Sequence, residues 1–244
     1  MTYLPQNFFF LDLENTTGKN EEVINIPGRL TAKGVIGVQF RSPFKCLLVG
    51  PSNSGKTTLL HSILQTDNIF NTKFHCITYH YSEHQPLFDE IKKSVKDISF
   101  VEGLPEKIER HDNDFCLLIL DDLLTDASNS EIILDLFLKK SHHLGKSLFF
   151  LSQNLFYSGK YFRNLSLNSD YFIMFKPIRD KLQALTFFRQ VFPEKHSFNC
   201  GLVHSIMREP YSYLMLDLKQ DTKDNLRIWG NITTDMPVVY TCEY

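Results

Sequence analysis

The chain has 244 residues and a formal net charge of −2, with 43% hydrophobic and 22% charged residues. This composition excludes a largely disordered protein, and the length is sufficient for one large α/β domain with short appendages. The near-zero charge of the whole chain gives no evidence for or against binding to nucleic acid. The sequence has neither a signal-peptide pattern nor an apolar stretch of membrane-spanning length, so we expect a soluble intracellular protein.

The charges are unevenly distributed along the chain. Residues 139–208 carry 11 Lys and Arg against 3 Asp and Glu, a local charge of +8, and the rest of the chain sums to −10. A segment of this kind can present a basic surface to an anionic polymer. It can equally be a solvated face that acidic neighbours balance. Both interpretations stay open at this point.

The cysteines number five and do not form a C-x-x-C pair. They are Cys46, Cys76, Cys116, Cys200 and Cys242. Three of them lie inside apolar runs, where cysteine behaves as a small hydrophobic residue. This usage predicts a reducing compartment.

Apolar runs alternate with segments of helical period from Pro43 onward. Residues 1–40 are glycine-containing and irregular, which predicts an N-terminal arm or a few edge strands. A core domain at 41–220 and a C-terminal tail at 221–244 follow. The patterns predict strands at 44–50, 73–81, 97–103, 115–122, 146–154, 169–176 and 210–218, and helices at 55–67, 85–95, 129–145 and 179–192. Strands separated by helices predict an α/β fold whose mostly parallel sheet has helices on both faces.

A phosphate-binding loop is the most specific motif. "GPSNSGKT", at 50–57, fits G-x-x-x-x-G-K-[ST] at every fixed position and lies between a predicted strand and a predicted helix. Glycines let backbone N–H groups surround phosphate oxygens, Lys56 can reach the β- and γ-phosphates, and Thr57 can offer a hydroxyl to Mg²⁺. The expected nucleotide-binding residues are Gly50, Pro51, Ser52, Asn53, Ser54, Gly55, Lys56, Thr57 and Thr58.

Two adjacent acids end the buried strand "CLLILDD". In an open α/β sheet, ligands bind at the carboxyl ends of the strands. We therefore expect Asp121 to hold the water shell of Mg²⁺ and Asp122 to orient or deprotonate the attacking water. Aspartate is shorter than the glutamate that many ATPases use, so the local backbone must compensate for the length of Asp122. The alternative is a simple helix N-cap, because the chain continues toward a predicted helix.

Polar residues also end the following strand, "LFFLSQN". We expect Gln153 to sense the γ-phosphate, as in ATPases that carry an extra strand between the two Walker motifs, with Asn154 beside it. A polar strand end that only forms a turn is the alternative. Arg163 and Arg179 are candidates for an arginine supplied to a neighbouring subunit, since such a residue stabilises the charge of the transition state. Either arginine can instead be a surface residue or a DNA contact.

These motifs together resemble a family. "GPSNSGKTT", "LLILDDLL", "FLKKSHHLGKSLFFLSQNLF", "RNLSLNSDYFIMFKPIRDK" and "PYSYLMLDLK" resemble the genome-packaging ATPases of the FtsK–HerA superfamily, in particular those of poxvirus-like viruses, Polinton-type elements and adintoviruses. The resemblance covers roughly residues 43–230. The acidic pair followed by S-Q-N and N-S-x-Y-x-x-x-F-K is more specific than the phosphate loop alone.

The resemblance implies a RecA-like core that assembles into a homo-oligomeric ring and uses ATP and Mg²⁺ to drive double-stranded DNA into a capsid. It implies partners at the capsid or portal vertex and a location in virus-infected cells. It matches Lys56 and Thr57 to the phosphate and Mg²⁺ residues, Asp121 and Asp122 to the Walker B pair, and Gln153 to the sensor. No motif fixes the arginine. Basic residues would line the channel, and the candidates are Lys139, Lys140, Lys146, Lys160 and Lys176.

Two other functions compete with packaging. A viral helicase of the superfamily 3 type shares an Asp-Asp Walker B pair, but it normally presents Asn as its sensor and carries an additional N-terminal domain. A nucleotide-binding scaffold without turnover is the second alternative, which the complete set Lys56, Thr57, Asp121 and Asp122 disfavours. No N-K-x-D motif appears, which disfavours a GTPase.

Overall fold

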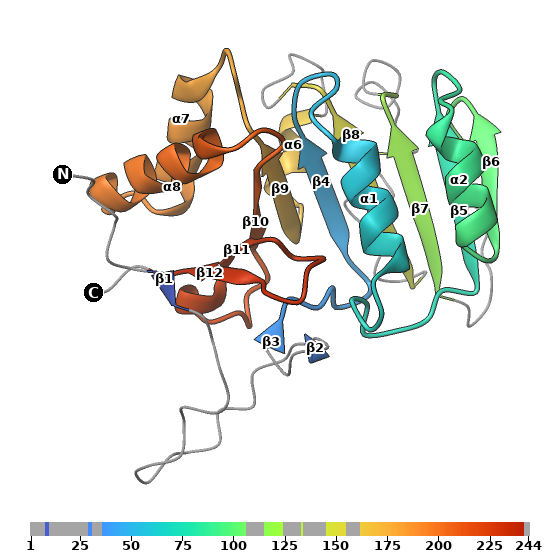
Figure 1. Ribbon diagram of the computed structural model, residues 1–244, viewed down its shortest axis with the longest axis horizontal. Helices are drawn as coiled ribbons and strands as arrows, with labels where there is room; N and C mark the ends of the chain where they lie inside the picture. The colour runs from blue at the N-terminus through green and yellow to red at the C-terminus, as the bar shows by residue number, and fades with distance from the viewer. Residues whose placement is uncertain are drawn as a thin grey trace, which may run out of the picture.

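Most of the strands belong to one twisted sheet. The computed structural model describes residues 8–9, 29–30, 36–105, 115–123, 133, 145–154 and 162–241. Within them, ten strands form a single sheet in the order β1-β12-β11-β10-β9-β4-β8-β7-β5-β6 (Figure 1). A separate two-stranded ribbon pairs β2 (Arg29–Leu30) with β3 (Ile36–Gly37).

Six strands make up the parallel part of the sheet. They are β4 (Lys45–Val49), β5 (Cys76–Tyr81), β6 (Ile98–Glu102), β7 (Cys116–Asp121), β8 (Lys146–Ser152) and β9 (Tyr171–Phe175). Every neighbouring pair in the series β9-β4-β8-β7-β5-β6 is parallel. All six carboxyl ends therefore lie at one edge of the sheet, which is the edge at which ligands bind in open α/β sheets.

The other four strands extend the sheet in antiparallel fashion. β10 (Tyr213–Asp217) pairs with β9, and β11 (Ile228–Gly230), β12 (Val238–Tyr240) and β1 (Phe8–Phe9) follow in turn. A short 3₁₀ turn, η3 (Asp224–Leu226), precedes β11. The segments expected as an arm (1–40) and a tail (221–244) thus contribute strands to the main sheet. The short strands carry too few alternating residues to be recognised in the sequence.

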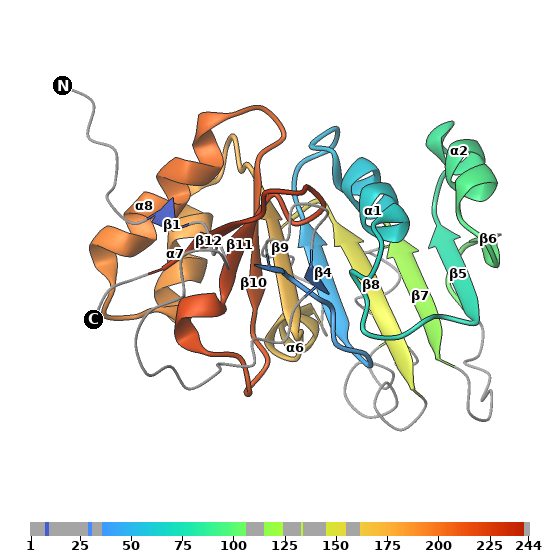
Figure 2. The same ribbon diagram turned by 60° about the horizontal axis from the view of Figure 1, so that its bottom comes forward.

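Helices cover both faces of the sheet, as expected. α1 (Lys56–Gln65) and α2 (Leu87–Ser94) pack on one face, and α6 (Phe162–Leu167), α7 (Lys181–Val191) and α8 (His196–Arg208) pack on the other. Figure 2 shows α7 and α8 side by side at one end of the sheet and α2 at the opposite end. The sequence did not predict α8, and the helix expected at 129–145 lies outside the described residues apart from Ile133, which is helical. No helix in the described ranges is both long and apolar enough to cross a bilayer.

Burial on both faces explains why the central strands are apolar along most of their length. In β4, Cys46 and Leu48 pack with α1 and α2, whereas Leu47 and Val49 face the opposite core with α7 and α8. All five residues of β4 and all seven of β8 are buried. Successive side chains of a strand point to opposite faces, so a strand covered on both sides is apolar through its middle, and the polar residues Lys45, Lys146, Ser147 and Ser152 lie at the strand ends.

The strand order identifies the fold class. β8 lies between β4, which leads into the glycine-rich loop, and β7, which ends in the two acids. This arrangement is that of P-loop NTPases with an extra strand between the Walker motifs. The chain therefore has a RecA-like α/β P-loop NTPase fold, which confirms the sequence-based prediction.

Two cysteines of the parallel strands are paired. Cys76 of β5 and Cys116 of β7 are partners in the strand register and form a disulfide, whereas Cys46 and Cys200 are free. The sequence had predicted thiols in a reducing compartment. The two cysteines are 40 residues apart, and no sequence motif marks them as a pair. They are adjacent only because the sheet places β5 beside β7.

A cluster of charges ties the antiparallel strands to the start of the core, at the edge opposite the carboxyl ends. Arg41 donates to Asp217 at 3.1 Å and also pairs with Asp221, and its backbone N–H donates to the Tyr171 hydroxyl at 3.0 Å. The Asp170 carboxylate accepts from the Lys45 N–H at 2.8 Å. These contacts join segments that are 125 to 180 residues apart in the sequence.

We predict that Leu148→Ala in β8 lowers the free energy of unfolding by about 3 kcal/mol or more, because it leaves a cavity in a fully buried position. Leu182→Ala is the matched control: Leu182 is 72% exposed, and we expect a change within about 0.5 kcal/mol. Chemical denaturation of both variants measures the difference. Equal effects would contradict the described core.

Candidate nucleotide site

The loop after β4 surrounds a concave backbone surface at the carboxyl edge of the sheet. Asn53 and Gly55 have φ values of 61° and 94°, which turn the chain tightly into α1. The Gly50 N–H donates to the Ser152 carbonyl at 3.1 Å and so fixes the loop to β8. A methyl group on Gly50 would lie 2.6 Å from Phe175 Cβ and 2.7 Å from Ser54 Oγ, so only glycine fits there. Backbone N–H groups in such a turn, at a helix N-terminus, attract anions.

Lys56 lies folded across its own loop. Its Nζ donates to the carbonyl oxygens of Gly50 at 2.8 Å and Pro51 at 3.1 Å, and the residue is only 7% exposed. Burial lowers the pKa of Lys56, and the nearby Asp122 and Asp121 carboxylates oppose this shift. Its ammonium group is therefore held where the phosphates of a nucleotide are expected.

Asp121 lies at the end of β7, directly opposite the start of α1. Its Oδ2 accepts from the Tyr79 hydroxyl at 2.5 Å and from Thr57 Oγ1 at 3.5 Å. Burial raises the pKa of Asp121 to about 6, and the hydrogen bond from Tyr79 opposes that rise. Burial also raises the pKa of Tyr79 well above its usual value, so Tyr79 stays a hydrogen-bond donor. The sequence analysis had not named Tyr79, because a tyrosine within an apolar strand gives no signal of its own.

Gln153 connects the phosphate loop to the second acid. Its Oε1 accepts from Ser52 Oγ at 3.0 Å, and its Nε2 donates to Asp122 Oδ2 at 3.0 Å. Asp122 has a φ of 53°, a region that aspartate tolerates better than most residues. The structure places the predicted sensor against Asp122 and Ser52, and it places Asp121 against Thr57 at the start of α1.

The residues fit a nucleotide with a divalent cation. The Thr57 hydroxyl and the Asp121 carboxylate are neighbouring hard oxygen donors, which Mg²⁺ prefers. Ser54 Oγ is buried and has no hydrogen-bond partner among the described residues, which leaves it available to a phosphate oxygen. Thr58 is exposed in the first turn of α1.

A cavity of about 580 Å³ adjoins the loop on the side of β9. It is lined by Val49, Gly50, Pro51, Ser52, Gln153, Asn154, Met174, Phe175, Pro177, Ile178, Arg179, Asp180 and Gln183. Arg179 is exposed. Because it lines this cavity together with Gly50 and Pro51, it borders the phosphate loop of its own chain. Arg163 lies in α6, and its side chain is outside the described residues.

The five basic residues considered for DNA contacts fall in different places. Lys146 is only 8% exposed and begins β8, at the edge opposite the phosphate loop. Lys176 is partly exposed and follows β9 directly, at the phosphate edge. Lys139, Lys140 and Lys160 lie outside the described residues.

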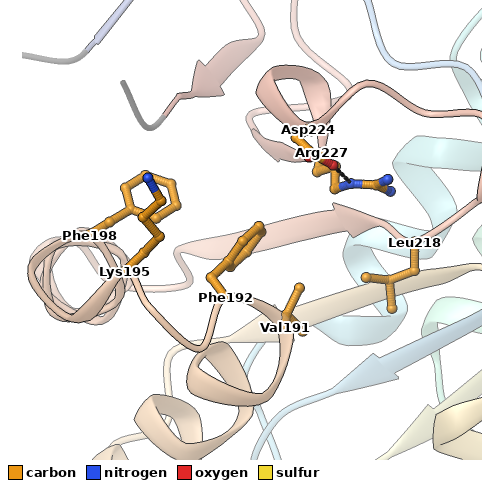
Figure 3. Close-up of a pocket in the computed structure, with 7 residues that line it drawn as sticks. All are labelled: Val191, Phe192, Lys195, Phe198, Leu218, Asp224 and Arg227. Carbon is orange, nitrogen blue, oxygen red and sulfur yellow. Dashed lines mark hydrogen bonds and ion pairs between the residues drawn. The ribbon is translucent and has the colours of Figure 1, made fainter. Parts of the chain in front are cut away.

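A second, smaller cavity of about 170 Å³ lies between the ends of α7 and α8 and the turn before β11 (Figure 3). Val191, Phe192, Lys195, Phe198, Leu218, Asp224 and Arg227 line it. Arg227 donates to Asp224 at 2.7 Å and to the carbonyl oxygens of Asp217 and Lys219 at 3.1 and 3.0 Å. The Arg227 guanidinium group therefore stabilises the turn before β11 through these hydrogen bonds.

No family model and no curated protein matches the sequence. Several solved structures are similar in shape. The genome-packaging NTPase B204 of Sulfolobus turreted icosahedral virus 2, in complex with sulfate, is 15% identical with a TM-score of 0.47, over 73% of this chain and 93% of that chain. The cytoplasmic domain of the Thermomonospora curvata type VII secretion ATPase EccC is 15% identical with a TM-score of 0.47, over 82% and 25%. The KaiC-like protein PH0186 of Pyrococcus horikoshii OT3 is 13% identical with a TM-score of 0.41, over 82% and 90%.

We predict that Asp121→Asn stabilises the nucleotide-free protein above pH 6. An acid whose folded pKa is raised from 3.8 to about 6 binds its proton more tightly in the folded state, so stability falls as pH rises through this window. The shift corresponds to about 3 kcal/mol at pH 7. Thermal unfolding of both proteins without Mg²⁺ measures it. The gap in Tm should widen by several degrees from pH 4 to pH 7; a constant gap would contradict the raised pKa.

Proposed function

We propose that this protein is an ATP-driven motor that translocates double-stranded viral DNA into a capsid. The observation that carries the catalytic part is the meeting of the phosphate loop, Asp121, Asp122 and Gln153 at one edge of the sheet. A simple N-cap would explain the two acids, but it would not explain why Asp121 accepts from the Thr57 hydroxyl and why Asp122 accepts from Gln153, which itself accepts from Ser52. The translocation part rests on the resemblance of the motifs to packaging ATPases and on the basic segment 139–208.

The phosphate loop would bind the triphosphate through its backbone N–H groups and through Lys56. On binding, the Lys56 ammonium would exchange its contacts with the Gly50 and Pro51 carbonyls for the β- and γ-phosphate oxygens. Thr57 and Asp121 would hold Mg²⁺, which neutralises charge on the β- and γ-phosphates when bound. Tyr79 would keep the Asp121 carboxylate oriented through its 2.5 Å hydrogen bond.

Asp122 would position the attacking water and accept its proton. Gln153 donates to the same carboxylate and accepts from Ser52 in the loop, so it would register whether a γ-phosphate is present. Loss of the γ-phosphate would then alter the end of β8 and the segment that follows it. We assign to this change the coupling between hydrolysis and movement on DNA.

Arg179 and Arg163 would act on different sites. Because Arg179 lines the cavity beside its own phosphate loop, we propose that it contacts the phosphates of the nucleotide bound in its own subunit. Arg163 remains our candidate for the arginine supplied to the neighbouring subunit of a ring. Lys176, at the same sheet edge, is our candidate for a DNA phosphate contact.

The test of the whole function is ATP-dependent displacement of a triplex-forming strand from duplex DNA, together with ATPase rates with and without DNA. We expect the wild-type protein to hydrolyse ATP faster with duplex DNA and to displace the third strand. Asp122→Asn should bind ATP and Mg²⁺ with near wild-type affinity but lose at least about 100-fold in turnover, because the water is no longer activated. Lys56→Ala should lose binding.

Three other outcomes would redirect the assignment. Unwinding of forked DNA without duplex translocation would favour a helicase. ATP hydrolysis equal to that of Lys56→Ala would favour a scaffold. Unchanged turnover in Asp122→Asn would remove Asp122 from the mechanism.

Mixed assemblies distinguish the two arginines. Arg163→Ala combined with Lys56→Ala should recover ATPase activity, because the Lys56→Ala subunits supply an intact Arg163 to sites that still bind nucleotide. Arg179→Ala combined with Lys56→Ala should not recover, because each Arg179→Ala site lacks its own arginine. Steady-state ATPase rates across mixing ratios measure this, and the reverse pattern would exchange the two roles.

A further inference from the structure

Tyr211 lies in the turn between α8 and β10, at the phosphate edge of the sheet. β10 runs antiparallel to β9, and Tyr213 pairs with Phe175, the last residue of β9. The chain that enters β10 therefore passes beside the carboxyl ends of β9 and β4 (Figure 1). A residue 36 positions after the end of β9 thus lies next to the loop that precedes α1.

The Tyr211 side chain lies beside the phosphate loop. A methyl group placed on Gly55 would lie 3.7 Å from Tyr211 Cδ1 and 3.9 Å from Tyr211 Cβ. Gly55 is the N-cap of α1 and immediately precedes Lys56 and Thr57. The ring of Tyr211 is therefore within one side-chain length of the point where the phosphates are expected.

The Tyr211 ring does not pack in the hydrophobic core. Tyr211 is 68% exposed, and no aromatic ring of a described residue pairs with it, whereas the neighbouring Phe175 and Tyr213 rings pack against each other at 5.5 Å. Exposed aromatic rings next to a concave polar loop are typical of ligand contacts and not of structural packing. The Tyr211 ring thus leaves a large aromatic surface accessible beside the loop.

Tyr211 has an unfavourable backbone conformation, and neighbouring hydrogen bonds hold it there. Tyr211 has a φ of 59°, a left-handed conformation that is unusual for a bulky residue. The Ser212 hydroxyl donates to the Ile206 and Glu209 carbonyls, and the Lys176 N–H donates to the Ser212 carbonyl at 3.0 Å. Residues that the surrounding structure holds in an unfavourable backbone conformation are often found at ligand-binding sites.

The order of the strands indicates which end of a nucleotide reaches Tyr211. Asp122 and Gln153 must lie near the γ-phosphate, and they follow β7 and β8, on one side of β4. Tyr211 lies on the other side of β4, beyond β9. Because the triphosphate is a linear chain, its γ end at Asp122 requires its nucleoside end to leave the loop on the side of Tyr211.

We propose that Tyr211 is the residue on which the nucleobase stacks, a deepening that rests on the proposed nucleotide binding. The ring would contribute affinity for purine nucleotides and would position the phosphates by holding the far end of the molecule. Stacking on an aromatic face tolerates any base. Tyr211 would therefore strengthen the binding of ATP and GTP alike, and discrimination between them would come from elsewhere.

Isothermal titration with Mg²⁺ and three ligands tests this: a non-hydrolysable ATP analogue, its GTP counterpart and inorganic tripolyphosphate, which has no base. Tyr211→Ala should bind both nucleotides about tenfold more weakly and bind tripolyphosphate as the wild type does. Tyr211→Phe keeps the ring and should bind all three normally. Tyr211→Gly suits the positive φ, so it should keep the fold and show the same selective loss.

The outcomes separate this inference from the proposed function. If the wild type binds no ligand more tightly than Lys56→Ala does, nucleotide binding itself fails. If the wild type binds nucleotide but Tyr211→Ala and Tyr211→Gly bind it equally well, only the stacking role is overturned. Equal losses for nucleotides and tripolyphosphate would also overturn it, because the residue would then shape the loop. A loss of duplex DNA affinity with unchanged nucleotide affinity would assign the ring to DNA instead.

Discussion

The parallel register of β4, β8 and β7 is the constraint on which the site depends. Val49 pairs with Ser152, and Leu151 pairs with Asp121. The three strands therefore end at one level, and the residues that follow each of them face one another across distances that hydrogen bonds can span. A shift of β8 by one residue would turn its side chains to the opposite face of the sheet. Gln153 would then no longer meet both Ser52 and Asp122.

Burial at this edge gives each polar group a defined state before any ligand arrives. Asp121 is 2% exposed and Lys56 is 7% exposed, so neither is solvated as it would be at a surface. Desolvation raises the pKa of the acid and lowers that of the base, and neighbouring groups partly reverse both shifts. Phosphate oxygens would give the Lys56 ammonium a fully charged partner, and a divalent cation would do the same for the Asp121 carboxylate.

The sequence predicted the parts of the molecule that local chemistry determines. Each fixed position of the phosphate loop needs a particular residue type, and the apolar runs before Gly50, Asp121 and Ser152 need burial on both faces, so these features were visible without coordinates. Among the antiparallel strands, β10 was predicted at 210–218, but β11 and β12 were not, because they have only three residues each and depend on a neighbour for their pairing. α8 was missed because it contains Gly201 and residues of modest helix propensity such as Asn199 and Cys200. The disulfide, Tyr79 and Tyr211 depend on contacts between distant segments, which no local pattern encodes.

The α7–α8 hairpin has a mechanical consequence. It leaves the sheet after β9 and returns to it before β10, and both connections emerge at the nucleotide edge. α8 alone has 13 residues, or a length of about 20 Å. A small rotation at either connection would therefore move the far end of the hairpin through a larger distance than the connection itself. At the opposite edge of the sheet, Arg41 ties the antiparallel strands to the start of the core.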